Sequence, residues 1–79
     1  MKPLNWNPCK NTKLKQERGI GFETVRAALI IGAYSIRKLR SKNHPGQKGF
    51  IIRYPWKTWI VPYRENQESI FLHTIFEDK

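Results

Sequence analysis

The sequence predicts an α+β domain, in which two N-terminal helices pack on an antiparallel sheet of three or four strands. Three observations support this prediction: a helix start at Asn7-Pro8, an apolar stripe with helical spacing after Gly21, and three alternating runs in the second half. With 79 residues, the chain is expected to form a single domain, 1–79. A domain of this size has little room for a deep cavity, so chemistry is expected on an open face.

Two helices are predicted in the first half of the chain. After a lead-in whose Leu4 and Trp6 can anchor to the core, Asn7 caps a helix that runs through Gln16 or Glu17. A second helix is predicted over Phe22 to Ile31, where apolar residues recur every three or four positions. Glycines separate the first helix from the second and end the second.

Four strands are predicted in the rest of the chain. A short strand over Ala33 to Leu39 precedes a basic loop, residues 40–48. Three longer runs follow, over Gly49 to Tyr54, Thr58 to Tyr63 and Ile70 to Phe76, and the short links between them indicate hairpins. Alternate residues of each run share one face: Phe50, Ile52 and Tyr54; Trp59, Val61 and Tyr63; Ile70, Leu72, Thr74 and Phe76.

Positive charge is concentrated in the first part of the chain. The net charge is +9; residues 1–48 hold 11 basic and 2 acidic side chains, whereas residues 49–79 hold 4 of each. This asymmetry favours an acidic partner, namely nucleic acid, an anionic membrane or an acidic protein. The alternative is an ordinary basic protein without such a partner.

The composition also bears on compartment and cofactors. Cys9 is the only cysteine, so no intrachain disulfide can form, which fits a reducing compartment. Two histidines and one cysteine, far apart in the sequence, make a poor zinc set, and we expect no metal and no cofactor. The longest apolar run, Ala27 to Ile31, is too short to span a membrane. We therefore expect a cytoplasmic protein without a membrane partner.

Several segments resemble the BrnT family of bacterial toxins. The opening resembles that family in Asn5-Trp6-Asn7, Lys10-Asn11, Lys15, Arg18-Gly19-Ile20, Phe22-Glu23 and Val25. A related subgroup is similar in His44-Pro45 with Gln47, Ile60-Val61-Pro62-Tyr63 and Ile70-Phe71-Leu72-His73-Thr74-Ile75. The resemblance covers most of the chain, and it is carried by the order and spacing of these pieces together.

This resemblance implies a RelE-like fold, ribonuclease activity that inhibits translation, and a small DNA-binding antitoxin encoded alongside. One departure is the end of the chain, Phe76-Glu77-Asp78-Lys79, where the family usually continues with a basic stretch. This departure favours the alternative function, a non-catalytic basic binding protein such as an inactive toxin relative or an adaptor for an acidic protein.

Metal-independent RNA cleavage needs a base, an acid and cations that stabilise the phosphorane. His44 and His73 are the acid–base candidates, since histidine titrates near neutrality, and Arg40 and Lys48 are candidate cations. Glu23 is a further candidate base. The alternatives are a His-Pro turn for His44, an exposed strand position for His73, and stabilisation of a helix start for Glu23.

Further basic and aromatic residues are candidates for RNA binding. With Arg40 and Lys48, the densest basic stretch contains Arg37, Lys38 and Lys42, and Lys10, Lys13 and Lys15 could extend it. Trp56 could stack on a base, whereas Trp59 is expected in the core. The alternative is that these lysines form a solvated surface. The expected partners are RNA and a small antitoxin whose acidic segment neutralises the basic face.

Overall fold

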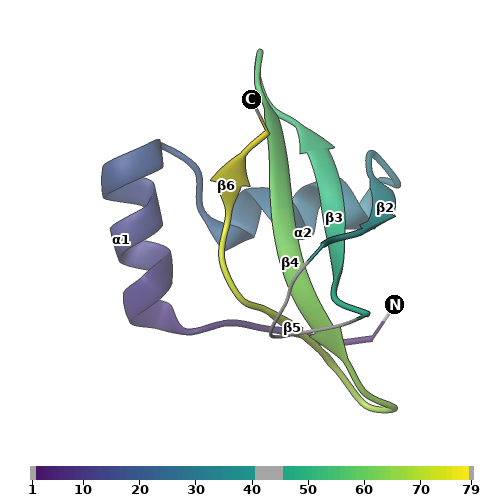
Figure 1. The fold of residues 1–79 in the computed structure, drawn as a ribbon. Helices are drawn as coiled ribbons and strands as arrows, with labels where there is room; N and C mark the ends of the chain where they lie inside the picture. Colours follow the sequence, from purple (N-terminus) through teal and green to yellow (C-terminus); the bar gives the residue numbers. More distant parts are fainter. Residues whose placement is uncertain (1, 41–45, 79) are drawn as a thin grey trace.

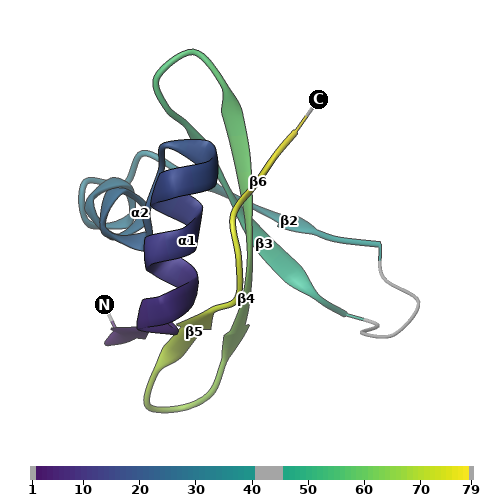
Figure 2. The same ribbon diagram turned by 90° about the vertical axis from the view of Figure 1, so that its left-hand side faces the viewer.

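Two helices cover one face of a mixed six-stranded sheet in the computed structural model, which describes residues 2–40 and 46–78 (Figure 1). The helices are α1 (Pro8–Arg18) and α2 (Phe22–Ile30). The strands are β1 (Leu4–Asn5), β2 (Ser35–Lys38), β3 (Lys48–Arg53), β4 (Thr58–Glu65), β5 (Ile70–Leu72) and β6 (Phe76–Glu77). Figure 2 shows both helices on the same side of the sheet. The predicted α+β fold is thereby confirmed.

The sheet has more strands than predicted and is not purely antiparallel. The strand order is β1-β5-β4-β3-β2, with β6 also paired to β4. Neighbours from β2 to β5 are antiparallel, as expected, but β1 runs parallel to β5, with Leu4 opposite Ile70. A two-residue strand is too short to show alternation, so the sequence indicated only that this segment is anchored to the core.

The two helices begin in different ways. The side-chain oxygen of Asn7 accepts hydrogen bonds from the backbone N–H of Cys9 and Lys10, at 2.8 and 3.2 Å, as predicted for an N-cap. The N-cap of α2 is Gly21, which has no side chain to offer. Instead, the buried Asn11 of α1 accepts the N–H of Phe22 at 2.7 Å. One helix therefore caps the other.

The core lies between the helices and the sheet face that they cover. Val25 and Leu29 of α2 are buried against this face, as their spacing predicts. The sheet contributes alternate residues of its strands: Phe50 and Ile52 of β3, Trp59, Val61 and Tyr63 of β4, Ile70 and Leu72 of β5. Tyr54 was expected to continue this set, but it follows the end of β3 and is exposed.

The last predicted strand is interrupted. Residues after the interruption therefore face the opposite side of the sheet from the one that the alternation predicted. His73 donates its N–H to Pro62 O, whereas Phe76 lies opposite Ile60. Two residues, 74 and 75, therefore face the single residue between Pro62 and Ile60, which defines a β-bulge. As a result, Ile75 is fully buried and Phe76 faces away from the core. The prediction that Phe76 shares the core face with Ile70 and Leu72 was therefore wrong.

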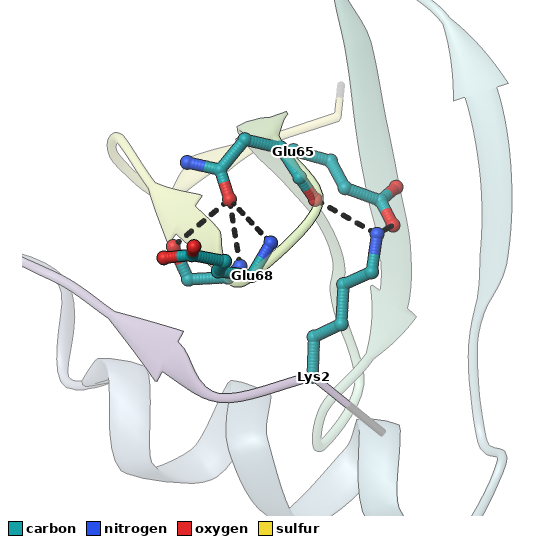
Figure 3. Close-up of polar contacts among 5 residues, drawn as sticks. Lys2, Glu65 and Glu68 are labelled. Carbon is teal, nitrogen blue, oxygen red and sulfur yellow. Dashed lines mark hydrogen bonds and ion pairs between the residues drawn. The ribbon is translucent and has the colours of Figure 1, made fainter.

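The N-terminal strand is also held by polar contacts (Figure 3). Lys2 Nζ donates to Glu65 Oε2 at 2.7 Å and to the carbonyl oxygen of Asn66 at 2.8 Å. The side-chain oxygen of Asn66 accepts the N–H groups of Glu68 and Ser69, both at 2.8 Å. An Asx turn of this kind stabilises the tight link between β4 and β5. The contacts of Lys2 thus join the start of the chain to this turn.

We expect Asn11→Ala to lower the free energy of unfolding by about 1–2 kcal/mol, because the buried N–H of Phe22 loses its acceptor. Urea denaturation followed by circular dichroism measures this loss. Gln16→Ala, an exposed change on the same helix, is the control and should stay within about 0.5 kcal/mol of the wild type. Equal stability of both variants would contradict the capping role of Asn11.

Candidate functional site

The hairpin of β2 and β3 carries a cluster of positive charge. Lys38 lies directly opposite Lys48 in the strand register, and both side chains are exposed. Arg37 precedes Lys38 and the exposed Arg40 follows two residues later, and we name these four residues the cationic hairpin. Like charges at directly opposed strand positions are destabilising. An anionic ligand at this position would remove that repulsion.

The described acids leave most of this cluster unneutralised. Among the described residues, no carboxylate forms an ion pair with Lys38, Arg40 or Lys48, whereas Arg37 Nη1 lies 3.5 Å from Asp78 Oδ2. Figure 2 shows the hairpin projecting away from the helices. His44 and Lys42, the other predicted members of this region, lie outside the described residues.

Arg37 and His73 lie on the sheet face that carries no helix. Arg37 is opposite Gly49, Gly49 is opposite Pro62, and Pro62 accepts the N–H of His73 at 2.9 Å. The two residues therefore occupy one level of the sheet, three strand spacings apart, or about 14 Å between their backbones. This face also presents Phe71, which contacts the imidazole of His73 edge-on with ring centroids 5.2 Å apart.

His73 is on the predicted face but in a more enclosed setting than expected. The alternation along the last strand predicted that His73 points away from the core, and the register confirms this. The expected exposed position is wrong, since the side chain is half-buried. The ring of Phe71 packs against its imidazole.

Glu23 belongs to a structural network on the helical side of the sheet. Its Oε2 accepts Asn11 Nδ2 at 2.8 Å and lies 2.9 Å from Lys15 Nζ. The hydrogen bond from Lys15, with further bonds from its own backbone N–H and Asn11, lowers the pKa of the Glu23 carboxyl below its ordinary value. A general base needs a pKa near the working pH. The helix-start interpretation therefore suits Glu23 better than the catalytic one.

The lysines of α1 are partly neutralised within their own helix pair. Lys15 is bound to Glu23, and Lys13 Nζ lies 3.9 Å from Glu17 Oε1. Lys10 is exposed and has no ion-pair partner among the residues that the structure describes. Since α1 packs on the opposite side of the sheet from His73, these lysines do not extend the cationic hairpin directly.

The predicted core position of Trp59 is confirmed, whereas Trp56 does not lie close to the cationic hairpin. Trp59 is buried in the core, whereas Trp56 is 90% exposed in the turn between β3 and β4. Lys48 begins β3 and Trp56 follows its other end, so the strand separates them by about 17 Å. Trp56 is thus available for stacking, at a distance from the cluster.

Sequence reasoning missed two arginines on the helix-free face. Arg53 lies next to the buried Ile52, and Arg64 next to the buried Tyr63, so both point away from the core. Arg64 is opposite Phe71, close to the level of His73. The alternation that places Ile52 and Tyr63 in the core also places Arg53 and Arg64 on the opposite face, so the sequence pattern could have identified both arginines.

Neither a family model nor a curated protein sequence matches this chain. In residues 2–40 and 46–78, no group of three or more His, Cys, Asp or Glu side chains is placed to hold a metal ion. Neither helix of the described chain is long and apolar enough to cross a membrane.

We expect the stabilising effect of Glu23 to depend on pH. Because its pKa is lowered from 4.5 on folding, the ionised carboxylate stabilises the fold above about pH 4.5, and this contribution is lost as pH falls through the folded pKa. The stability difference between wild type and Glu23→Gln should therefore shrink from about pH 7 to about pH 3. Urea denaturation at each pH measures it.

Glu68→Gln is the control for this titration, since no ion pair joins Glu68 to a described cation. A difference between wild type and Glu23→Gln that stays constant over the same pH range would mean that Glu23 does not contribute through its charge.

Proposed function

We propose that this protein is a cytoplasmic toxin-type ribonuclease, which binds RNA around the edge of the cationic hairpin, from Lys38 and Lys48 on the helical face to Arg37 on the helix-free face, and cleaves it without a metal. The observation that carries the proposal is the opposed pair Lys38 and Lys48, which no described carboxylate neutralises. A phosphate backbone supplies closely spaced negative charge and would relieve this repulsion.

The helix-free face adds features that favour single-stranded RNA. Phe71 and Phe76 are partly exposed on it, Arg64 lies opposite Phe71, and Arg53 is on the same face. Aromatic faces stack on unpaired bases, and arginines bind phosphates, so the two kinds of side chain together suit an RNA single strand. Resemblance to the BrnT toxins, carried by the residues quoted above, points to the same substrate.

For cleavage, we propose that His73 and His44 exchange the protons of the reaction. One would take the proton of the 2′-hydroxyl, and the other would give a proton to the leaving oxygen. Arg40 and Lys48 would stabilise the negative phosphorane. Arg37 would first have to leave Asp78, and a phosphate can displace this half-exposed carboxylate.

One observation favours the alternative, a non-catalytic basic binding protein. The candidate catalytic residues do not converge, because Glu23 is engaged with Lys15 on the helical side, and Lys48 and His73 lie on opposite faces of the sheet. Binding and cleavage are therefore tested separately below.

For binding, we expect the triple variant Lys38→Ala, Arg40→Ala, Lys48→Ala to bind a labelled single-stranded RNA with a flatter salt dependence. Each lost phosphate contact lowers the slope of log K against log salt by about 0.7, so three lower it by about 2. Fluorescence anisotropy at several salt concentrations gives the slope.

The control for binding removes equal charge from the helical side, as Lys10→Ala, Lys13→Ala, Arg26→Ala. These side chains are exposed, so the fold should persist in both triple variants. If the slope of log K against log salt flattens in the control variant and is unchanged in the hairpin variant, the RNA path lies over the helices.

For cleavage, we expect the purified protein to cut an end-labelled RNA equally well with and without EDTA. His44→Ala should abolish cutting while RNA binding by anisotropy stays unchanged. Loss of cutting in EDTA that magnesium restores would refute the metal-independent mechanism. Unchanged RNA together with salt-dependent binding would support the non-catalytic alternative.

A further inference from the structure

Two hollows lie along the seam between α2 and the sheet, on the sheet face opposite to that of Arg37 and His73. Lys38 and Lys48 share this helical face with Ile36 and Phe50, which line the smaller hollow. The larger has a volume of about 430 Å³ and is bounded by β1 and α2. Its lining residues are Lys2, Pro3, Leu4, Trp6, Arg26 and Ile30. The smaller, about 170 Å³, lies between the end of α2 and strands β2 to β5, with Leu29, Tyr34, Ile36 and Glu65 among its lining residues.

The two hollows form one surface, which we name the seam groove. Ile30 lines the larger hollow, and its neighbour Leu29 lines the smaller one. Lys2 of the larger hollow is bound to Glu65 of the smaller one at 2.7 Å, and Figure 3 shows this ion pair reaching across from the N-terminal strand. The two hollows are therefore adjacent, with the Lys2–Glu65 ion pair between them.

The groove is bordered by large apolar side chains that the fold leaves in solvent. Ile30 and Ile31 at the end of α2 are 62% and 77% exposed, and Ile36 on the edge strand β2 is 54% exposed. Tyr34 lies between them in sequence and is also exposed. Soluble domains rarely expose a continuous apolar patch that has no partner.

The charges around the groove favour an acidic occupant. Glu65, the single acid among the lining residues, is neutralised by Lys2. Arg26 is exposed and forms no ion pair with any described carboxylate. A second copy of this chain would bring another +9 to the same surface. The most exposed side chains at the groove, Ile30, Ile31 and Ile36, are aliphatic and suit the apolar face of a protein helix, so we choose an acidic protein segment over RNA.

We propose that the seam groove binds an acidic amphipathic helix of a protein partner. Such a helix presents apolar anchors three or four residues apart on one face, and two of them would fill the two hollows on either side of the Lys2–Glu65 ion pair. Acidic side chains beside the anchors would lie near Arg26. This proposal does not depend on RNA binding or cleavage.

The test uses a fluorescein-labelled peptide of roughly 18 residues, about five helical turns, with leucines on one face and glutamates elsewhere. A scrambled peptide of identical composition removes the apolar face but keeps the charge. Anisotropy with the full chain should show that the patterned peptide binds at least about tenfold more tightly than the scrambled one. Equal binding of the two, or none, would overturn the proposal.

Three variants locate the peptide on the protein. Ile30→Glu and Ile36→Glu should each lower the affinity for the patterned peptide by about tenfold or more. Trp56→Glu makes the same kind of change at an exposed site in the β3–β4 turn and should alter binding by less than about twofold. Circular dichroism checks that all three fold. A loss in Trp56→Glu equal to that in the isoleucine variants would overturn the proposal.

Two further measurements separate the other occupants. If sedimentation shows that the protein alone is a dimer and that Ile30→Glu is a monomer, the groove is a self-association surface and the proposal fails. RNA affinity should be nearly the same for Ile30→Glu and Trp56→Glu, which carry the same change of charge at positions away from Lys38 and Lys48. A selective loss of RNA binding in Ile30→Glu would assign the groove to RNA instead.

Discussion

The side-chain amide of Asn11 determines how the two helices meet, and the rest of the fold depends on that junction. Its oxygen caps α2 at Phe22, and its nitrogen donates to Glu23, which also binds Lys15 of α1. A β-carbon on Gly21 would come within 2.9 Å of that oxygen, so only glycine leaves room for the cap. With the helices joined in this way, both pack on one face of the sheet, and the other face is left for a ligand.

Elements with a local cause were predictable from the sequence. The cap at Asn7 and the stripe of Val25 and Leu29 each depend on residues a few positions apart, and both helices form as expected. The alternation in β3 and β4 likewise placed Phe50 and Trp59 in the core. In these segments, short-range periodicity and long-range packing agree.

Features with a long-range cause were not predictable. The parallel strand β1 forms because its backbone pairs with β5, 66 residues away along the chain at Leu4 and Ile70. The bulge after Leu72 adds one residue, so the side chain of Ile75 points into the core. The carbonyl oxygen of Ile75 accepts a hydrogen bond from Arg18 of α1. β5 is far from β1 along the chain, and Arg18 is far from Ile75, so no local pattern indicates either contact. For the candidate site, the charge of the hairpin was evident, but the pairing of Arg37 with Asp78 and the engagement of Glu23 were not.

The placement of charge separates the two surfaces that the molecule offers. Five of the six acids form ion pairs, and four of these pairs, of Lys2, Lys13, Lys15 and Lys57, lie outside the hairpin. Among the described residues, Lys38, Arg40 and Lys48 therefore keep their charge close together at the hairpin, whereas Arg26 is the unpaired cation among the residues that line the seam groove. RNA would accordingly depend on charge at the hairpin, and a protein partner on apolar contact at the seam. The two surfaces adjoin at β2, because Ile36 of the groove is two residues from Lys38 on the same face of the strand, so a partner anchored at the seam would bring its acidic side chains close to the hairpin.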